Sequence, residues 1–215
     1  YLIKPVNPKQ ILLTIKKLID NKRLVSEKTS MAYQQDFRNL GMTLNENLSY
    51  SEWVDVYKKL VFWELSLEKL EDVGMREILT LQKAEANTQF FKFIEKNYLN
   101  WLKKPDSGPI TSNQPFKKKV FPALEANKPT FFILIDNLRY DQWKVINSLL
   151  TDYYRVDEED CFYSILPTAT QYARNAIFSG LMPLDMEKRF PGMWQNDEDE
   201  GGKNLFEDKF LTDQI

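Results

Sequence analysis

The sequence predicts an α/β chain with an all-α connector in its middle. Three observations lead to this expectation. A short strand-like segment and a helix-length segment open the chain, and residues 21–104 carry apolar side chains at helical spacing. From Thr130 onward, apolar strand-like runs alternate with helix-length runs. Such alternation is typical of a largely parallel sheet, whose ligands bind at the carboxyl ends of the strands.

Composition narrows the class of protein. The 215 residues are enough for one large or two modest domains, and 43% of them are hydrophobic. The single Cys161 excludes a disulfide within the chain, suits a reducing cytosol, and is interpreted as a small buried residue. No apolar run reaches the length of a membrane span and no signal-peptide pattern opens the chain. We therefore expect a cytoplasmic protein with no membrane insertion.

Charge is distributed unevenly along the chain. Residues 1–25 hold six basic side chains and one acidic one, whereas residues 105–215 hold 12 basic and 18 acidic ones. An acidic domain lacks the broad positive surface of a nucleic-acid-binding protein. We expect any phosphate ester handled here to be attracted locally, by a metal.

Residues 1–22 resemble the C-terminal end of a CheY-like receiver domain. Their sequence, YLIKPV followed by a helix near Pro8–Asn21, matches the last strand and helix of a receiver. By this resemblance, Lys4 contacts the phosphoryl group of a phosphorylated aspartate, Pro5 follows in a cis peptide bond, and Tyr1 is the aromatic switch residue. The resemblance implies a magnesium ion at a phosphorylation site upstream of Tyr1, and a sensor histidine kinase as partner. The alternative is a lysine that lies beside a helix-starting proline.

Residues 23–104 are predicted to form a helical connector built as a three-helix bundle. The first helix is expected near Ser26–Leu40, and Ser49 or Ser51, with Glu52, can cap the second. The third helix is expected from about Met75, after Gly74, to Lys103. The second helix has an apolar stripe of Trp53, Val56, Leu60, Trp63, Leu67 and Leu70, and the third one of Ala86, Phe90, Phe93, Ile94 and Trp101. Tryptophan at this spacing indicates a core, so we predict a connector without chemistry of its own.

Residues 105–129 are predicted to be a linker, because they contain five prolines, Gly108 and a cluster of Thr, Ser and Asn. The basic run Lys117–Lys119 is interpreted as a solvated loop.

Residues 130–215 are predicted to begin an α/β domain. Strands are expected at Thr130–Asn137, which places Asp136 at its end, and at Tyr153–Val156 and Cys161–Ile165. Helices are expected near Arg139–Leu150 and Gln171–Ser179. After Pro191 the sequence predicts a loop. Its acidic run Asp197–Glu200 is interpreted as solvated and mobile, with cation binding as the alternative.

The segment Leu166–Pro183, LPTATQYARNAIFSGLMP, carries the candidate chemistry. A threonine at a strand-to-helix turn can present its hydroxyl beside backbone N–H groups that bind phosphate. A carboxylate on a neighbouring strand end, here Asp136, could hold a metal against that hydroxyl. Two capping alternatives stay open: Asp136 or Asn137 as the N-cap of the following helix, and a Thr168–Gln171 capping box.

The spacing P-T-x-T-x(9)-G-L-x-P resembles the nucleophile segment of the alkaline phosphatase superfamily, in its phosphodiesterase branch. By this resemblance Thr170 is the nucleophile, and Asp136 and Thr170 are ligands of the activating metal, zinc. The run Asp136–Tyr140, DNLRY, resembles the PglZ-type members. The sequence departs from the phosphodiesterase pattern at Gln171 and Tyr172, which replace an aromatic-proline pair, and at Arg174, where histidine is common.

A receiver end, a helical connector and a PglZ-like domain together resemble the PorX-type response regulators. This resemblance implies a signalling protein that forms a homodimer on phosphorylation and acts in type IX protein secretion. It implies secretion-system or transcription components as partners, and a zinc-dependent phosphodiesterase acting on oligonucleotides or cyclic nucleotides. We expect a fragment cut at both ends, inactive alone, with the remaining zinc ligands beyond residue 215. The alternative is a non-catalytic signalling and protein-docking module that retains the fold.

Overall fold

The computed structural model describes residues 8–45, 47–70, 73–125 and 128–215. Within them the chain divides into two compact units, with the boundary in the sequence between Leu99 and Asn100. The strand predicted for the first six residues lies outside the described residues.

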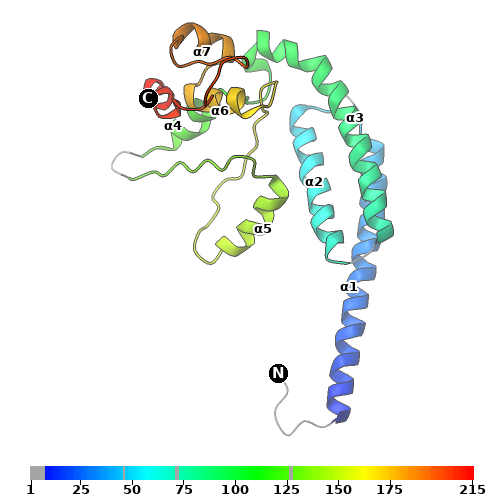
Figure 1. Cartoon of the computed structure of the whole chain (residues 1–215). Helices are drawn as coiled ribbons and strands as arrows, with labels where there is room; N and C mark the ends of the chain where they lie inside the picture. Colours follow the sequence, from blue (N-terminus) through cyan, green and yellow to red (C-terminus); the bar gives the residue numbers. More distant parts are fainter. Residues whose placement is uncertain (1–7, 46, 71–72, 126–127) are drawn as a thin grey trace. The chain divides into compact units, whose positions relative to one another are not determined.

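The first unit is built on three helices, α1 (Pro8–Thr43), α2 (Tyr50–Glu68) and α3 (Val73–Lys103). The sequence predicts two separate helices where α1 is one continuous helix of 36 residues. The reason is that no proline or glycine occurs between Pro8 and Gly41, so nothing interrupts the backbone hydrogen bonds. Only the C-terminal part of α1 packs beside α2 and α3, and its N-terminal part projects beyond them (Figure 1).

The start of α2 is capped as the sequence predicts. The Ser49 Oγ accepts a hydrogen bond from the Glu52 N–H, and the Glu52 carboxylate accepts one from the Ser49 N–H at 2.7 Å. This reciprocal capping box satisfies two backbone donors that a helix start leaves free, which is typically worth about 1 kcal/mol.

The core of the first unit confirms the predicted apolar stripes. Trp53 packs edge-on against Phe90, with ring centroids 5.3 Å apart, so the two stripes meet. The buried core side chains of this unit are Tyr33, Leu40, Trp53, Val56, Leu60, Val61, Trp63, Leu67, Leu79, Ala86 and Phe93. Leu70, Phe90 and Ile94, which the sequence places in the stripes, are half-buried. Trp101, also predicted for the third stripe, is buried in the second unit against Tyr163. Trp63 donates its indole N–H to Asp36 at 3.0 Å, whereas the buried indole N–H of Trp53 finds no acceptor.

The second unit contains short helices joined by long irregular segments. They are η1 (Pro105–Ser107), the π-helical η2 (Phe116–Val120), α4 (Phe121–Ala123), α5 (Tyr140–Leu150), α6 (Thr170–Ser179), α7 (Pro183–Arg189) and α8 (Glu207–Gln214). The expected helices near Arg139–Leu150 and Gln171–Ser179 are present within a residue, while α7 and α8 fall where the sequence predicts no helix.

The predicted linker is folded as part of the second unit. Ser112 and Phe116 are buried within it, and the Ser112 hydroxyl accepts a hydrogen bond from the Ile165 N–H at 3.1 Å. Lys119 pairs with Glu158 and Asp160, each at 2.7 Å, so the basic run is not a freely solvated loop. The proline and glycine content correctly predicted an irregular backbone. The burial of Phe116 shows that this segment is nevertheless packed into the second unit.

The predicted parallel sheet is wrong for the described residues, which contain no strand. The β-bridge found among these residues is an isolated parallel pair between Thr111 and Tyr163. The run Thr130–Asp136 is extended but pairs with no neighbouring segment, and Phe131 and Ile133 are exposed. A strand is stabilised by hydrogen bonds and side-chain contacts with a partner strand, and an apolar run alone supplies neither. Cys161 is half-buried rather than buried.

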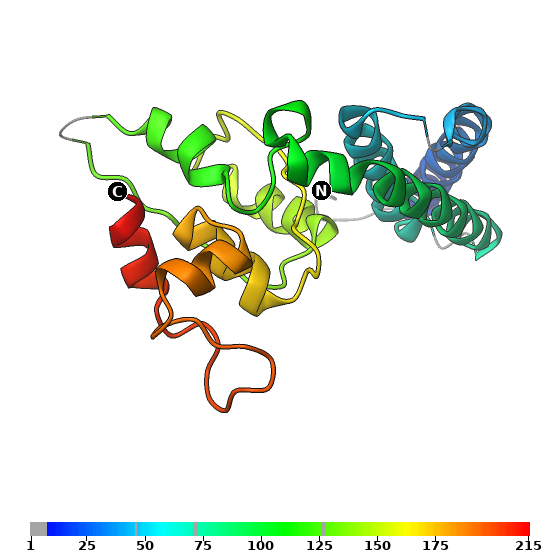
Figure 2. The ribbon, with the colours of Figure 1, turned by 90° about the horizontal axis from the view of Figure 1, so that it is seen from above.

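A small apolar core supports α6. It consists of Ile165, Ala176, Met186 and Trp194, and α6 packs against α7 and α8 at one end of the unit (Figure 2). Gly180 ends α6 with a φ of 66°, a left-handed conformation that glycine adopts without strain. Across the described residues, no helix has both the length and the apolar character that a membrane span requires.

Candidate functional site

Asp136 lies at the end of the extended segment and just before α5. Asn137 follows it with a φ of 58°, a left-handed conformation that asparagine tolerates, and this turns the chain toward the helix. The N-cap of α5 is Arg139, whose N–H donates to Gln142 Oε1 at 3.0 Å. Neither Asp136 nor Asn137 is therefore the helix cap, and the carboxylate of Asp136 is left for other contacts.

Thr170 is the first residue of α6, and its side chain is exposed. The N-cap is Ala169, which offers no side-chain acceptor, so no capping bond is formed there. The Thr168–Gln171 capping box considered above is consequently absent. A helix start without a side-chain cap keeps backbone donors and the positive end of the helix dipole beside Thr170.

Arg174 joins Asp136 to Glu207 on the surface of α6. Its Nη1 donates to Asp136 Oδ2 at 3.1 Å, while Nε and Nη2 donate to the two carboxylate oxygens of Glu207 at 2.5 and 2.6 Å. The pKa of Arg174 is raised mainly by its hydrogen bonds to Glu207. Partial burial lowers this pKa, and the hydrogen bond to Asp136 raises it further. The guanidinium is permanently charged and held along one edge.

This contact brings Asp136 to the helix that Thr170 begins. Residues four apart in a helix are neighbours on one face, so Thr170 and Arg174 share a face of α6. Asp136, which lies 34 positions before Thr170 in the chain, is linked to α6 through the arginine one turn after that threonine.

The acidic loop closes against the same helix start. Asp197 accepts hydrogen bonds from the Gln171 amide and, at 2.8 Å, from the Tyr172 hydroxyl. The bond to Asp197 is the main cause that raises the pKa of Tyr172. Asp197 is exposed, as predicted for a solvated run, but it is also hydrogen-bonded to the two residues that follow Thr170.

Two asparagines connect α6 to the loop before α8. Asn175 is only 3% exposed and donates its amide to the Lys203 carbonyl at 2.9 Å. Asn204 donates to Asn175 Oδ1 at 3.0 Å and lies 3.4 Å from the Thr170 carbonyl. These bonds fix the loop that ends at Asn204 around the backbone of Thr170.

Sequence reasoning missed most of these supporting residues. Arg174 carried a usable signal, since it lies four positions after the candidate nucleophile and must share its helix face. Glu207 and Asn204 carried none, because they are more than 30 residues from Thr170 and lie in a region predicted to be loop.

The gathered residues do not by themselves make a metal centre. A structural or catalytic zinc ion takes three or four protein ligands of carboxylate, imidazole or thiolate type. Among the described residues, no three His, Cys, Asp or Glu side chains come together in a way that could hold a metal. Asp136 and Thr170 offer one carboxylate and one hydroxyl, and Arg174 already neutralises the carboxylate.

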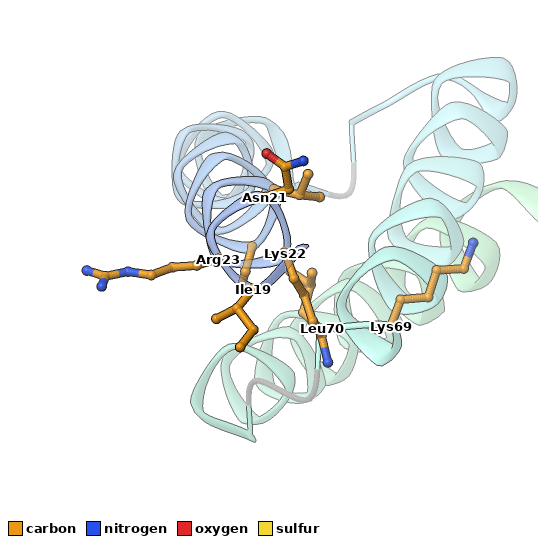
Figure 3. Close-up of a pocket in the computed structure, with 8 residues that line it drawn as sticks. Ile19, Asn21, Lys22, Arg23, Lys69 and Leu70 are labelled. Atoms are coloured by element: carbon orange, nitrogen blue, oxygen red, sulfur yellow. The ribbon is translucent and has the colours of Figure 1, made fainter. Parts of the chain in front are cut away.

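A separate hollow of about 580 Å³ lies between α1 and the end of α2, lined by Ile19, Asn21, Lys22, Arg23, Val25, Ser26, Lys69 and Leu70. In Figure 3 the Arg23 side chain points away from the hollow, and it pairs instead with Glu27 at 2.8 Å. Its lining combines apolar side chains with three basic residues and no acidic one, and we assign no chemistry there. The receiver switch residues Tyr1 and Lys4 lie outside the described residues.

Comparison with known families gives two matches along the chain. Residues 23–102 match the PorX response regulator linker domain. Residues 115–214 match the BREX system PglZ alkaline phosphatase-like domain, which contains Asp136, Thr170 and Arg174. The two matches, in this order, have the PorX-type architecture that the sequence motifs predict. No curated protein matches the chain.

Proposed function

We propose that this chain, in which a PorX response regulator linker domain leads into a PglZ alkaline phosphatase-like domain, belongs to a signalling protein whose output domain hydrolyses phosphate esters. The observation that carries the proposal is the position of Thr170. It is the exposed first residue of a helix with no side-chain cap, and it shares its helix face with an arginine. A nucleophile beside positive charge is the arrangement that attack on an anionic phosphoryl group requires.

The proposed reaction is a displacement at phosphorus. The Thr170 Oγ forms a bond to phosphorus as the bond from phosphorus to the ester oxygen breaks. The hydroxyl loses its proton and the leaving alcohol gains one. Water then attacks the phosphothreonine, which restores Thr170 and releases phosphate or a phosphate monoester.

Zinc remains an expectation for the intact domain. Its positive charge would lower the pKa of the Thr170 hydroxyl, for which no histidine in the chain could act as base. Asp136 and Thr170 would be two of its ligands, so further ligands are needed, and no chemical step here depends on the metal.

We expect phosphodiesters, such as oligonucleotides or cyclic nucleotides, as the substrates. Activity as a phosphodiesterase is the finer part of the proposal, and it rests on the threonine spacing described above. Type IX secretion as the regulated process, a histidine kinase as the activator and a cytoplasmic location belong to the same proposal, since they follow from the PorX-type resemblance.

The test is a pair of threonine substitutions in the full-length protein. Thr170→Val should abolish cleavage of a chromogenic phosphodiester while the circular dichroism spectrum and melting temperature stay unchanged. Thr168→Val, two residues earlier and before the start of the helix, is the matched control and should keep its rate within about twofold. Wild-type turnover in Thr170→Val would overturn the nucleophile assignment.

The second candidate is a protein-docking module that keeps the fold without catalysis. It is favoured by the pairing of Arg174 with Asp136, because a guanidinium on the expected metal ligand opposes metal binding. A pure wild-type protein that cleaves no phosphomonoester or phosphodiester, yet binds a secretion-system or transcription component, would support this candidate.

A further inference from the structure

The two ends of the Arg174 guanidinium have different surroundings. The edge formed by Nε and Nη2 makes two short bonds to Glu207, whose side chain is only 17% exposed. The Nη1 end makes a single, longer bond of 3.1 Å to Asp136, whose side chain is 45% exposed. Glu207 therefore anchors the side chain, whereas the contact with Asp136 lies open to solvent and can be exchanged.

An arginine anchored along one edge still offers donors along the other. The guanidinium has five N–H groups in a rigid fork, and the pair with Glu207 uses two of them. The remaining N–H groups include both on Nη1, one of which donates to Asp136, and Arg174 lies one helical turn after Thr170 on α6. A planar fork of this kind suits the non-bridging oxygens of a phosphoryl group.

Two other cations of this unit are engaged elsewhere. Lys203 donates to the carbonyls of Asn196 and Asp199, and Arg139 pairs with Asp141 at 2.8 Å. Because residues 105–215 have an acidic excess, an anionic ligand at Thr170 needs a local positive charge. Asp197 is an opposing negative charge at the start of α6, and the hydrogen bonds that it accepts from Gln171 and Tyr172 partly offset its repulsion.

We propose that Arg174 binds the phosphoryl group that Thr170 attacks, with its Nη1 end exchanging the Asp136 carboxylate for a non-bridging phosphoryl oxygen. Glu207 is the positioning residue that keeps the guanidinium in place during the exchange. This inference rests on the proposed function of Thr170. It adds a substrate requirement: the ligand must carry an anionic, non-bridging phosphoryl oxygen, which phosphomonoesters, phosphodiesters and inorganic phosphate all do.

The experiment measures the binding of inorganic phosphate to the full-length protein by isothermal titration calorimetry. Arg174→Gln removes the charge, and we expect it to weaken phosphate binding by roughly tenfold to a hundredfold, since a charged hydrogen bond is lost. Arg174→Lys should keep part of the affinity, because a point charge replaces the fork. Glu207→Gln should weaken binding less than Arg174→Gln does. Arg155→Gln, at an exposed arginine that pairs with Asp157, is the matched control and should bind phosphate within about twofold of wild type.

Steady-state kinetics and nuclear magnetic resonance separate this role from a structural one. A phosphoryl-binding arginine should raise KM for the chromogenic phosphodiester in Arg174→Gln, and the guanidinium ¹⁵N signals of wild-type Arg174 should shift on titration with phosphate. The resonance measurement needs no variant, so it decides the question even if Arg174→Gln fails to fold.

The inference and the proposed function can fail separately. Unchanged phosphate affinity in Arg174→Gln, or guanidinium signals that do not move as phosphate saturates the protein, would overturn the role of Arg174 whatever Thr170→Val does. Absence of phosphate binding by the wild type would overturn it as well. Loss of phosphate affinity in Arg174→Gln together with wild-type turnover in Thr170→Val would instead overturn the nucleophile and keep the anion site.

Discussion

Arg174 Nη1 lies 3.1 Å from Asp136 Oδ2, although the two residues are 38 positions apart in the chain. This contact sets the end of the extended segment against the face of α6 that begins with Thr170. It also means that the carboxylate expected to hold a metal is engaged by a cation.

Asp136→Ala should lower both zinc content and turnover in the full-length protein, because it removes the expected metal ligand. Stability should change by at most about 1 kcal/mol, since Asp136 is partly exposed and water weakens its pairing with Arg174. Metal analysis by mass spectrometry and urea unfolding are the two measurements. The control is Asp152→Ala, an exposed carboxylate after α5. A variant that retains the wild-type zinc content would show that Asp136 is not a metal ligand.

Leu60→Ala should lower the free energy of unfolding by about 2–5 kcal/mol, because Leu60 is buried in the core of the first unit. The matched control is Leu81→Ala on α3, where the leucine is exposed, and it should change stability by less than about 0.5 kcal/mol. Urea unfolding followed by tryptophan fluorescence measures both. Equal effects for the two leucines would contradict the assigned core.

Glu159 should make the stability of the second unit sensitive to acid. Burial tends to raise the pKa of this carboxyl, but hydrogen bonds from Tyr140, Lys144 and Trp143 outweigh it and lower the pKa to about 2. A lowered pKa stabilises the fold above the ordinary value of 4.5, and this contribution is lost as the pH falls from there toward about 2.

The corresponding variant is Glu159→Gln, which cannot lose a proton. It should be less stable than wild type at pH 7, and the difference should shrink as the pH is lowered from about 4.5 toward 2. Melting temperatures at several pH values measure this, with the exposed Glu198→Gln as control. A difference that stays constant over that range would show that Glu159 is not held in its charged form.

The receiver interpretation of Tyr1 and Lys4 predicts a change of oligomeric state. In the full-length protein, beryllofluoride with magnesium should convert monomer to dimer in sedimentation experiments, because it mimics the aspartyl phosphate. Lys4→Ala should remove the response, since its ammonium is the expected contact of the phosphoryl group. An unchanged mass in the wild type would contradict both the receiver and the dimer.

The local features of this chain were determined by the sequence alone. Side chains repeating every three or four residues place Trp53, Leu60 and Trp63 on one face of α2 whatever the helix packs against. The Ser49–Glu52 capping box is equally local, because its atoms are three residues apart. The two ends of α6 are local in the same way, and the sequence predicted them to within a residue. The threonine spacing also sufficed to indicate a phosphatase-like domain.

The tertiary structure decided which residues surround Thr170. Apolar runs at 130–136 and 161–165 predicted strands, but a strand exists only where another segment pairs with it, and such pairing is not encoded locally. In the same way, nothing near Asp197 or Glu207 in the sequence marks them as partners of α6. Their contacts arise because α8 and the loop before it fold back onto that helix, and long-range packing of this kind depends on the whole unit.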